Sequence, residues 1–109
     1  ESFNGDLTYF DTIFVSDMSR MFESAFSFNH DLSSFDTSNV TSMAYMFYSA
    51  SDFDHDLASF DISNVTSMAY MFTSASAFDR CLYWNVLGFQ NTYQMFYDSP
   101  GRLSSSYWC

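Results

Sequence analysis

The chain has 109 residues, of which 48% are hydrophobic, so it carries enough apolar side chains to fill the core of one packed domain. Thirteen acidic residues stand against three basic ones, and the formal charge of −10 argues against binding to nucleic acid or to anionic lipid surfaces. No apolar run is long enough to cross a bilayer, so direct membrane insertion is not expected. Aromatic residues reach 22%, an excess that calls for a structural reason.

Internal repetition supplies that reason. The pair Met-Phe recurs at 21–22, 46–47, 71–72 and 95–96, and the sequence NVTSMAYMF occurs at both 39–47 and 64–72. Self-similarity at a fixed period is typical of a repeat array. We therefore read residues 1–109 as a single repeat domain. It comprises a partial first repeat (1–20), two repeats (21–45 and 46–70), and a divergent last repeat with a C-terminal cap (71–109).

Each repeat is predicted to contain one short strand and one short helix. The pattern L-x-x-F-x-T/I predicts strands at 7–12, 32–37 and 57–62, with alternate positions facing inward. The recurrence of Val, Met, Met-Phe and Ala at i, i+3, i+6, i+7 and i+10 predicts helices at 15–25, 40–50 and 65–75. Thr41 and Thr66, or the Asn two residues before each, would be their N-caps. The predicted fold class is an α/β solenoid.

The strand pattern followed by N-V-T-x-M-x-x-M-F-x-x-A-x-x-F resembles the BspA-like surface-protein repeat, a leucine-rich-repeat-like family. The resemblance covers nearly the whole chain. It implies a right-handed, C-terminally capped coil with one short parallel strand and one short helix per turn. It also implies a secreted or cell-surface protein without catalytic activity. The chain departs from the family where Trp is usual, at Phe10, Phe35 and Phe60, and where Gly is common, at Ser24, Ser49 and Ser74.

The last repeat carries both cysteines of the chain, Cys81 and Cys109. Two are too few for a disulfide framework or a zinc site, but they suffice for one bridge. Cys81 replaces the Asp of earlier repeats, and a Cys81–Cys109 disulfide would hold the tail over the last hydrophobic layer. The extracellular location that the resemblance implies favours this bridge over two free thiols.

The N-terminus has no matching cap, because Glu1 begins in the middle of a repeat. Phe3, Leu7 and Phe10 would then present an uncovered layer and an open strand edge, which pairs readily with another chain. Head-to-tail contacts of this kind produce filaments. The other interpretation is that more repeats precede Glu1, and the two are compatible.

A lateral contact is a second expectation. Tyr45, Tyr48 and Tyr70 lie off the Val-Met-Phe face and should be exposed. Exposed tyrosines are typical of protein contacts, because they bury area and keep a hydroxyl for hydrogen bonding. Scattered surface aromatics are the alternative, and the repetition at 45 and 70 favours the contact.

Two N-x-Thr sequons stand at the same point of consecutive repeats, at Asn39 and Asn64. One interpretation is a pair of N-linked glycans on one edge of the coil. The other is an asparagine ladder, in which each side chain bonds the backbone of an adjacent turn. The sequence leaves both open.

Metal binding and catalysis find little support. Asp11, Asp36 and Asp61 form one series and Asp6, Asp31 and Asp56 another, and backbone capping explains them better than bound cations. Asp52, Asp54 and Asp56 resemble a Ca²⁺ cluster, but the Gly and Glu of a calcium loop are missing. His30 and His55 lack a third ligand in register. No nucleophile has an activating base, so neither a cofactor nor an enzyme activity is expected.

The function that follows is that of an extracellular structural protein. It would be a glycosylated subunit that assembles with itself into a filament or surface layer. Its partners would be further copies of the chain and N-linked glycans. The alternative is an adhesion or recognition ectodomain, a fragment of a longer cell-surface repeat protein.

Overall fold

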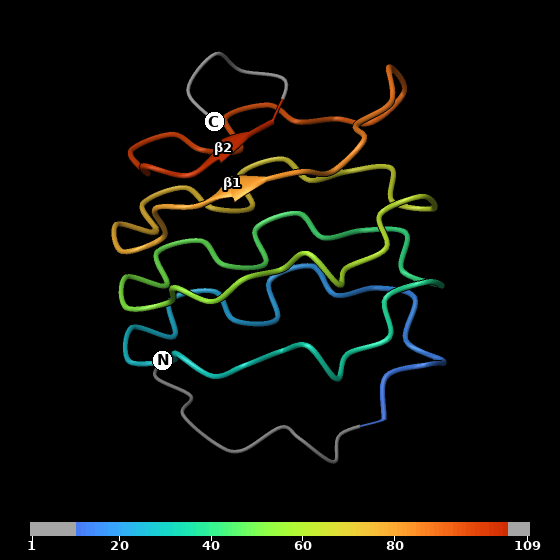
Figure 1. The fold of residues 1–109 in the computed structure, drawn as a ribbon, viewed down its shortest axis with the longest axis horizontal. Helices are drawn as coiled ribbons and strands as arrows, with labels where there is room; N and C mark the ends of the chain where they lie inside the picture. Colours follow the sequence, from blue (N-terminus) through green and yellow to red (C-terminus); the bar gives the residue numbers. More distant parts are fainter. Residues whose placement is uncertain (1–10, 105–109) are drawn as a thin grey trace.

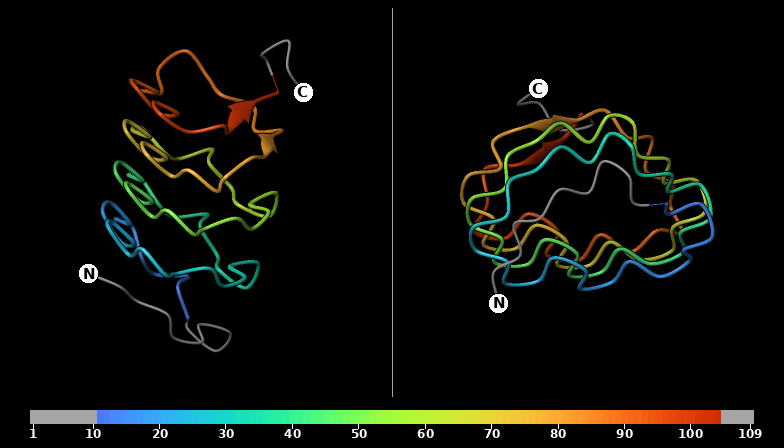
Figure 2. Two further views of the ribbon diagram at one scale, coloured as in Figure 1. Left: turned by 90° about the vertical axis from the view of Figure 1, so that its left-hand side faces the viewer. Right: turned by 90° about the horizontal axis from the view of Figure 1, so that it is seen from below.

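The computed structural model describes residues 11–104, whose backbone runs in turns stacked one above another (Figure 1). Seen from below, successive turns superimpose into one flattened outline (Figure 2). Backbone hydrogen bonds join residues 24 or 25 positions apart, such as Met18 N–H to Ser42 C=O and Thr66 N–H to Thr41 C=O. One sequence repeat therefore corresponds to one turn of the stack.

The prediction of an α/β solenoid with a helix in each turn is wrong. The described residues contain no helix. Their regular elements are two parallel strands of two residues each, β1 (Cys81–Leu82) and β2 (Arg102–Leu103), which lie side by side at the top of Figure 1. Isolated parallel bridges connect Asp17, Ser42, Ser67 and Asn91, within or beside the segments expected to be helical.

Left-handed residues explain why 40–50 does not form a helix. Tyr45 has φ of 60° and Ser49 has φ of 58°, so each completes a tight turn rather than an α-helical one. The amides of both residues donate to carbonyls of the next turn instead of to an oxygen four residues earlier. A left-handed L-residue costs about 1–2 kcal/mol, which these bonds between turns offset. The same conformation recurs at Arg20, Ser24, Tyr70, Ser74, Gln94 and Asp98.

The strands predicted at 32–37 and 57–62 are also absent, and the one at 7–12 lies largely outside the described residues. Phe60 N–H donates to Leu57 C=O, which closes a turn where the strand was expected. Buried Thr37 then links two turns, since its hydroxyl donates to Asp61 C=O (3.1 Å) and accepts from Asp61 N–H (2.8 Å). Side-chain hydrogen bonds thus connect neighbouring turns here, where backbone hydrogen bonds would connect the strands of a sheet.

Two columns of stacked phenylalanines fill the core. Phe22, Phe47, Phe72 and Phe96 form one column, with ring centroids 5.4 to 5.5 Å apart. Phe28, Phe53 and Phe78 form the second, with centroids 5.8 to 5.9 Å apart. Within each turn the two columns also stack, at 4.1 to 4.3 Å. The aromatic excess therefore follows from one ring per column per turn, a geometry that favours offset stacking.

The last turn departs from this regularity. Trp84 stacks on Phe60 and its ring N–H donates to Leu57 C=O at 3.2 Å. Gln90 is buried and its amide nitrogen donates to Ile62 C=O (2.8 Å) and Val65 C=O (2.9 Å). Side chains of this turn thereby add hydrogen bonds to carbonyls of the turn before it.

Candidate interaction surface

Tyrosines gather on the face of the stack that carries the left-handed residues. We call Tyr45, Tyr48, Tyr70 and Tyr93 the tyrosine surface. Tyr45 and Tyr70 occupy the same position of consecutive turns. The amide of Tyr45 donates to the carbonyl of Ala69, the residue just before Tyr70. The regular spacing of turns therefore brings their rings together.

The rings of the tyrosine surface contact one another. Tyr45 and Tyr70 stack with centroids 4.8 Å apart and planes 15° apart, and Tyr48 lies 5.4 Å from Tyr45. Tyr93 meets Tyr70 edge-on at 5.6 Å. The guanidinium of Arg20 lies 4.0 Å from the centroid of the Tyr45 ring and closes the row at one end.

This packing corrects one expectation about exposure. Tyr45, Tyr48 and Tyr70 are half-buried rather than fully exposed, because each ring covers part of its neighbour. Tyr93 and Tyr97 remain 60% and 63% exposed, and Phe26 52%. The sequence pattern did not identify Tyr93, because the last repeat is one residue shorter and its tyrosine is shifted by one position relative to Tyr70. The contact of Arg20 with this surface could have been predicted, since Arg20 stands 25 residues before Tyr45 and so occupies the same repeat position.

The electrostatics of the tyrosine surface differ from those of the rest of the chain. Segments 41–51 and 66–78 contain no charged residue, although the chain carries a formal charge of −10. Burial, followed by the neighbouring Tyr93, Tyr45 and Tyr48, raises the pKa of Tyr70. Its hydroxyl is therefore neutral at physiological pH. At the ends of the row, Arg20 pairs with Glu23 at 2.6 Å and Asp98 lies near Ser74.

Most aspartates lie outside these two uncharged segments, and several of them cap the backbone, as the sequence predicted. Asp36 accepts hydrogen bonds from the N–H and the hydroxyl of Ser38, and Asp61 does the same with Ser63. These bonds, the hydroxyl first, lower the pKa of both carboxyls. Asp11, Asp31 and Asp56 each accept one backbone N–H in the same way, whereas Asp6 lies outside the described residues.

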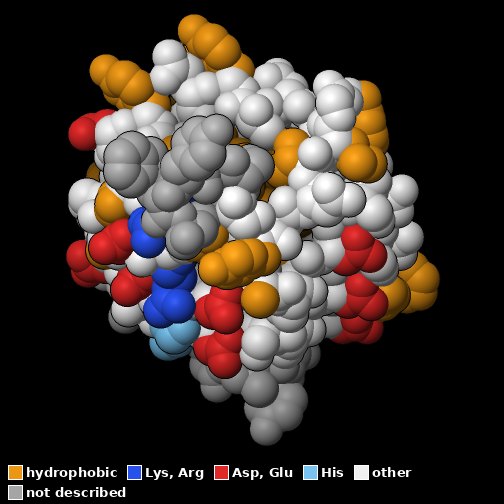
Figure 3. All heavy atoms as spheres, turned by 45° about the horizontal axis from the view of Figure 1, so that its top comes forward, with side chains coloured by type: hydrophobic (Ala, Val, Ile, Leu, Met, Phe, Trp, Pro, Cys, Tyr) orange, Lys and Arg blue, Asp and Glu red, His pale blue; other side chains and the backbone are white. Residues whose placement is uncertain are grey.

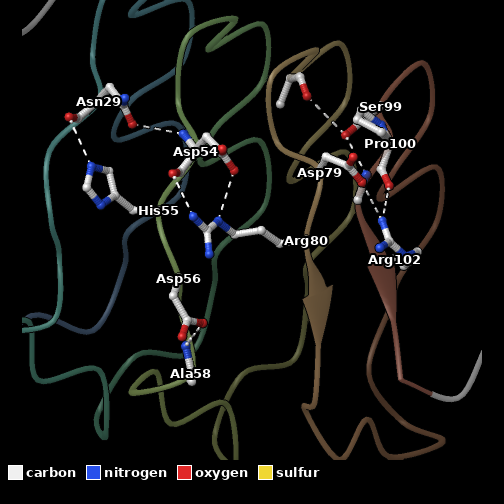
Figure 4. A network of polar contacts seen from close by, with 12 residues as sticks. Asn29, Asp54, His55, Asp56, Ala58, Asp79, Arg80, Ser99, Pro100 and Arg102 are labelled. Carbon is white, nitrogen blue, oxygen red and sulfur yellow. Dashed lines mark hydrogen bonds and ion pairs between the residues drawn. The ribbon is translucent and has the colours of Figure 1, made fainter. Parts of the chain in front are cut away.

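Two of the three carboxylates considered for calcium are engaged in other contacts. Asp54 accepts a hydrogen bond from the Arg80 guanidinium at 2.9 Å, and Asp56 caps Ala58 (Figure 4). Asp52 is exposed. Among residues 11–104 no group of three or more His, Cys, Asp and Glu side chains is arranged to hold a metal ion. His55 is bonded through Nε2 to Asn29 C=O at 3.2 Å.

Both sequon asparagines take part in a ladder between turns. The amide nitrogen of Asn39 donates to Ile13 C=O and that of Asn64 donates to Ser38 C=O, each at 2.7 Å. Both side chains are nevertheless exposed, so the ladder and a glycan remain compatible and glycosylation stays a prediction. Neither residue lies next to the tyrosine surface in sequence.

Cys81 of β1 is disulfide-bonded. Cys109, its predicted partner, lies outside the described residues, so the pairing stays a prediction. Phe3, Leu7 and Phe10, predicted to form an end-to-end contact, also lie outside them. Within the described part of the chain, no helix is long and apolar enough to span a membrane.

The family model described as "Mycoplasma protein of unknown function, DUF285" matches residues 1–106. No curated protein and no solved structure matches the chain.

Proposed function

The chain belongs to the DUF285 family, and from that premise we propose that it is a non-catalytic repeat protein of the cell surface or extracellular space that assembles with copies of itself. A BspA-like kinship is part of this proposal. It is supported by the motif N-V-T-x-M-x-x-M-F and by the extent of the family match, 106 of 109 residues.

One observation carries the proposal: an acidic protein keeps the middle of one face aromatic and free of charge. Protein interfaces are rich in tyrosine and poor in charge at their centres, with polar groups at the rim. The tyrosine surface matches this description, since Tyr45 and Tyr70 lie in its middle and Arg20, Glu23 and Asp98 lie at its ends.

The same division of charge favours a second copy as the partner. Two chains of charge −10 repel each other, and the repulsion is smaller when the surfaces that meet carry little charge. Contact through segments 41–51 and 66–78 has this advantage, because neither segment contains a charged residue. The end-to-end contact through Phe3, Leu7 and Phe10 would extend such pairs into a filament or layer.

Sedimentation velocity over a range of protein concentrations tests the proposal. We expect association of the wild-type chain, weakened at least roughly tenfold in a Tyr45→Ser/Tyr70→Ser double variant, because aromatic interface residues carry most of the binding energy. Tyr83→Ser is the matched control, since Tyr83 is exposed elsewhere on the molecule. Circular dichroism of each variant would verify folding. Only 12.6 kDa monomers at every concentration would contradict the proposal.

N-linked glycans at Asn39 and Asn64 form a separate part of the proposal. Both side chains are exposed on the same edge of consecutive turns. The intact mass of protein from its native source, measured before and after enzymatic deglycosylation, decides the point. An unchanged mass would leave only the ladder role for these asparagines.

The second candidate function is recognition of a foreign partner by an adhesion or recognition ectodomain. The observation that favours it is a group of exposed apolar side chains away from the tyrosine surface: Tyr83 is 77% exposed, Phe89 57% and Leu87 44%. A monomeric chain in the sedimentation experiment would favour this candidate over self-assembly.

A further inference from the structure

Tyr83 is an exposed aromatic residue that self-assembly through the tyrosine surface does not use. It is the single residue between Leu82 and Trp84, where the earlier turns have two, Ser33-Ser34 and Ala58-Ser59. In those turns the leucine carbonyl closes a turn, as Leu57 C=O does by accepting Phe60 N–H. Leu82 C=O instead accepts Ser104 N–H next to β2, and one residue fewer separates Leu82 from Trp84. Tyr83 therefore projects into solvent.

A hollow lies on each side of Tyr83. The first has a volume of about 360 Å³ and is lined by residues including Ala58, Asp56 and Arg80. The second, of about 290 Å³, is lined by residues including Ala58, Asp61 and Asn85. A third hollow of about 450 Å³ continues the first past Asp56 and Arg80 to Asp31 and His55. Because the three share Ala58, they form one shallow groove, which we call the Tyr83 groove.

The Tyr83 groove is acidic. Its lining includes four aspartates, Asp31, Asp56, Asp61 and Asp79, and one arginine, Arg80, which is already bound to Asp54. Asp79 pairs with Arg102 at 2.6 Å, whereas Asp56 and Asp61 form no ion pair among the described residues and Asp31 interacts electrostatically with His55. Hydrogen bonds from Ser33 and Ser63 lower the pKa of Asp31 and Asp61, which keeps both ionised at neutral pH. Figure 3 shows acidic side chains on both sides of the strip of basic and histidine side chains.

The molecule contains an example of the ligand that such a groove fits. Arg20 lies with its guanidinium 4.0 Å from the centroid of Tyr45 and donates a hydrogen bond to Glu23 at 2.6 Å. In this fold, therefore, an arginine is already bound by an aromatic ring together with a carboxylate. At Tyr83 the ring is present with Asp56 in one flanking hollow and Asp61 in the other, and Tyr83 has no arginine over it within the described residues.

We propose that the Tyr83 groove binds an extended, arginine-containing segment of a partner polypeptide. One guanidinium lies over the Tyr83 ring, and Asp56 and Asp61 accept its hydrogen bonds or those of the next basic side chain. Charge complementarity selects this occupant, because a basic segment is attracted both by the groove and by the whole chain of charge −10. Arginine is favoured over lysine, since its planar guanidinium stacks on aromatic rings and binds carboxylates with two donors. The inference goes beyond self-assembly and does not depend on it.

Nuclear magnetic resonance titration of the ¹⁵N-labelled protein with a capped Gly-Arg-Gly-Arg-Gly peptide tests this inference. We expect saturable shifts at residues 56–63 and 79–87, with binding that weakens as salt is added. Tyr83→Ser, which removes the aromatic ring, should weaken binding by roughly tenfold. Asp61→Asn should weaken it several-fold while its side-chain oxygen still caps Ser63. Tyr97→Ser, an exposed tyrosine elsewhere, is the control and should bind like the wild type.

Three results would overturn the inference. The first is the absence of saturable binding at low salt. The second is equal affinity of the wild type and Tyr83→Ser for the peptide, or equal affinity for its lysine counterpart, because either would indicate unspecific attraction by charge. The third is saturation of the same residues by a neutral oligosaccharide but not by the peptide, which would assign the groove to a glycan. Self-association, measured separately, changes in none of these cases, so failure here is distinguishable from failure of the proposed function.

Discussion

At the scale of single residues, the molecule accepts backbone strain at regular intervals. Ser24, Ser49 and Ser74 all have φ of 57° to 58°, in the left-handed region where L-residues are disfavoured. The BspA-like pattern commonly has glycine at this position. That departure was visible in the sequence, and its physical meaning is a turn that ends with a left-handed residue, not a helix.

Replacing Ser49 by glycine should therefore stabilise the protein. Relief of the left-handed strain exceeds the added flexibility of the unfolded chain, and the net gain should be roughly 0.5–1 kcal/mol. Urea denaturation would measure it. Ser59→Gly is the control, because Ser59 is exposed and does not have positive φ, so this change should give no gain. Equal effects of the two substitutions would contradict the account.

The capping aspartates predict a dependence of stability on acid pH. Asp36 has a pKa below its ordinary value of 3.8, chiefly because the Ser38 hydroxyl and then its N–H bond the charged form. Its contribution is thus fully present above the unfolded pKa and is lost as the pH falls through the lower, folded value. Asp36→Ala should flatten the fall in stability below about pH 4 relative to the wild type. Asp52→Ala, on an exposed residue without a capping bond in the described chain, should not; thermal melts at a series of pH values compare them.

At the scale of elements, the two phenylalanine columns end against backbone. A Cβ at Gly101 would come within 2.7 Å of Phe78 and 2.8 Å of Phe96. The absence of a side chain at residue 101 thus lets the segment before β2 pack directly on the last rings.

Gly101→Ala should destabilise the protein by about 1–3 kcal/mol, because the added methyl group overpacks a region of aromatic side chains. Gly88→Ala is a matched control, since a Cβ at residue 88 meets no atom within 4 Å. Chemical denaturation of both variants gives the comparison. A destabilisation of Gly88→Ala as large as that of Gly101→Ala would show that glycine flexibility, and not contact with Phe78 and Phe96, matters at these positions.

The buried residues of each turn could be predicted from the sequence, but the secondary structure could not. The residues placed on the inner face at 40–50, from Val40 to Ala50, are fully buried, because the repeat identifies apolar positions whatever the backbone does. The spacing i, i+3, i+7 fits a helix and also fits a series of tight turns. Only the conformations of Tyr45 and Ser49 decide between them, and a side chain says little about a φ imposed by hydrogen bonds to the neighbouring turn.

Of the two candidate sites, one could be predicted from the sequence and the other could not. Tyr45, Tyr48 and Tyr70 could be placed together, because repeat symmetry brings equal positions into contact. The Tyr83 groove could not be, because it arises where that symmetry fails. One missing residue between Leu82 and Trp84, and the pairing of β1 with β2, have no counterpart in the earlier turns.

At the scale of the whole molecule, the middle of the tyrosine surface is uncharged, whereas the Tyr83 groove is acidic. This separation predicts opposite effects of salt on the two proposed contacts. Added salt should strengthen self-association, because it screens the repulsion between chains of charge −10. It should weaken binding of the arginine peptide, which depends on attraction. Sedimentation and titration at low salt and at about 0.15 M would compare them, and a shared direction of change would contradict the division.

Contact between copies of the chain through the tyrosine surface can be measured in a dilution series of the ¹⁵N-labelled protein, followed by the backbone amide shifts of every residue. We expect concentration-dependent shifts at 41–51 and 66–78, including Tyr45 and Tyr70, and none at 31–36 or 56–63. Shifts confined to 31–36 and 56–63, or a spectrum that does not change with concentration, would contradict self-assembly through this surface.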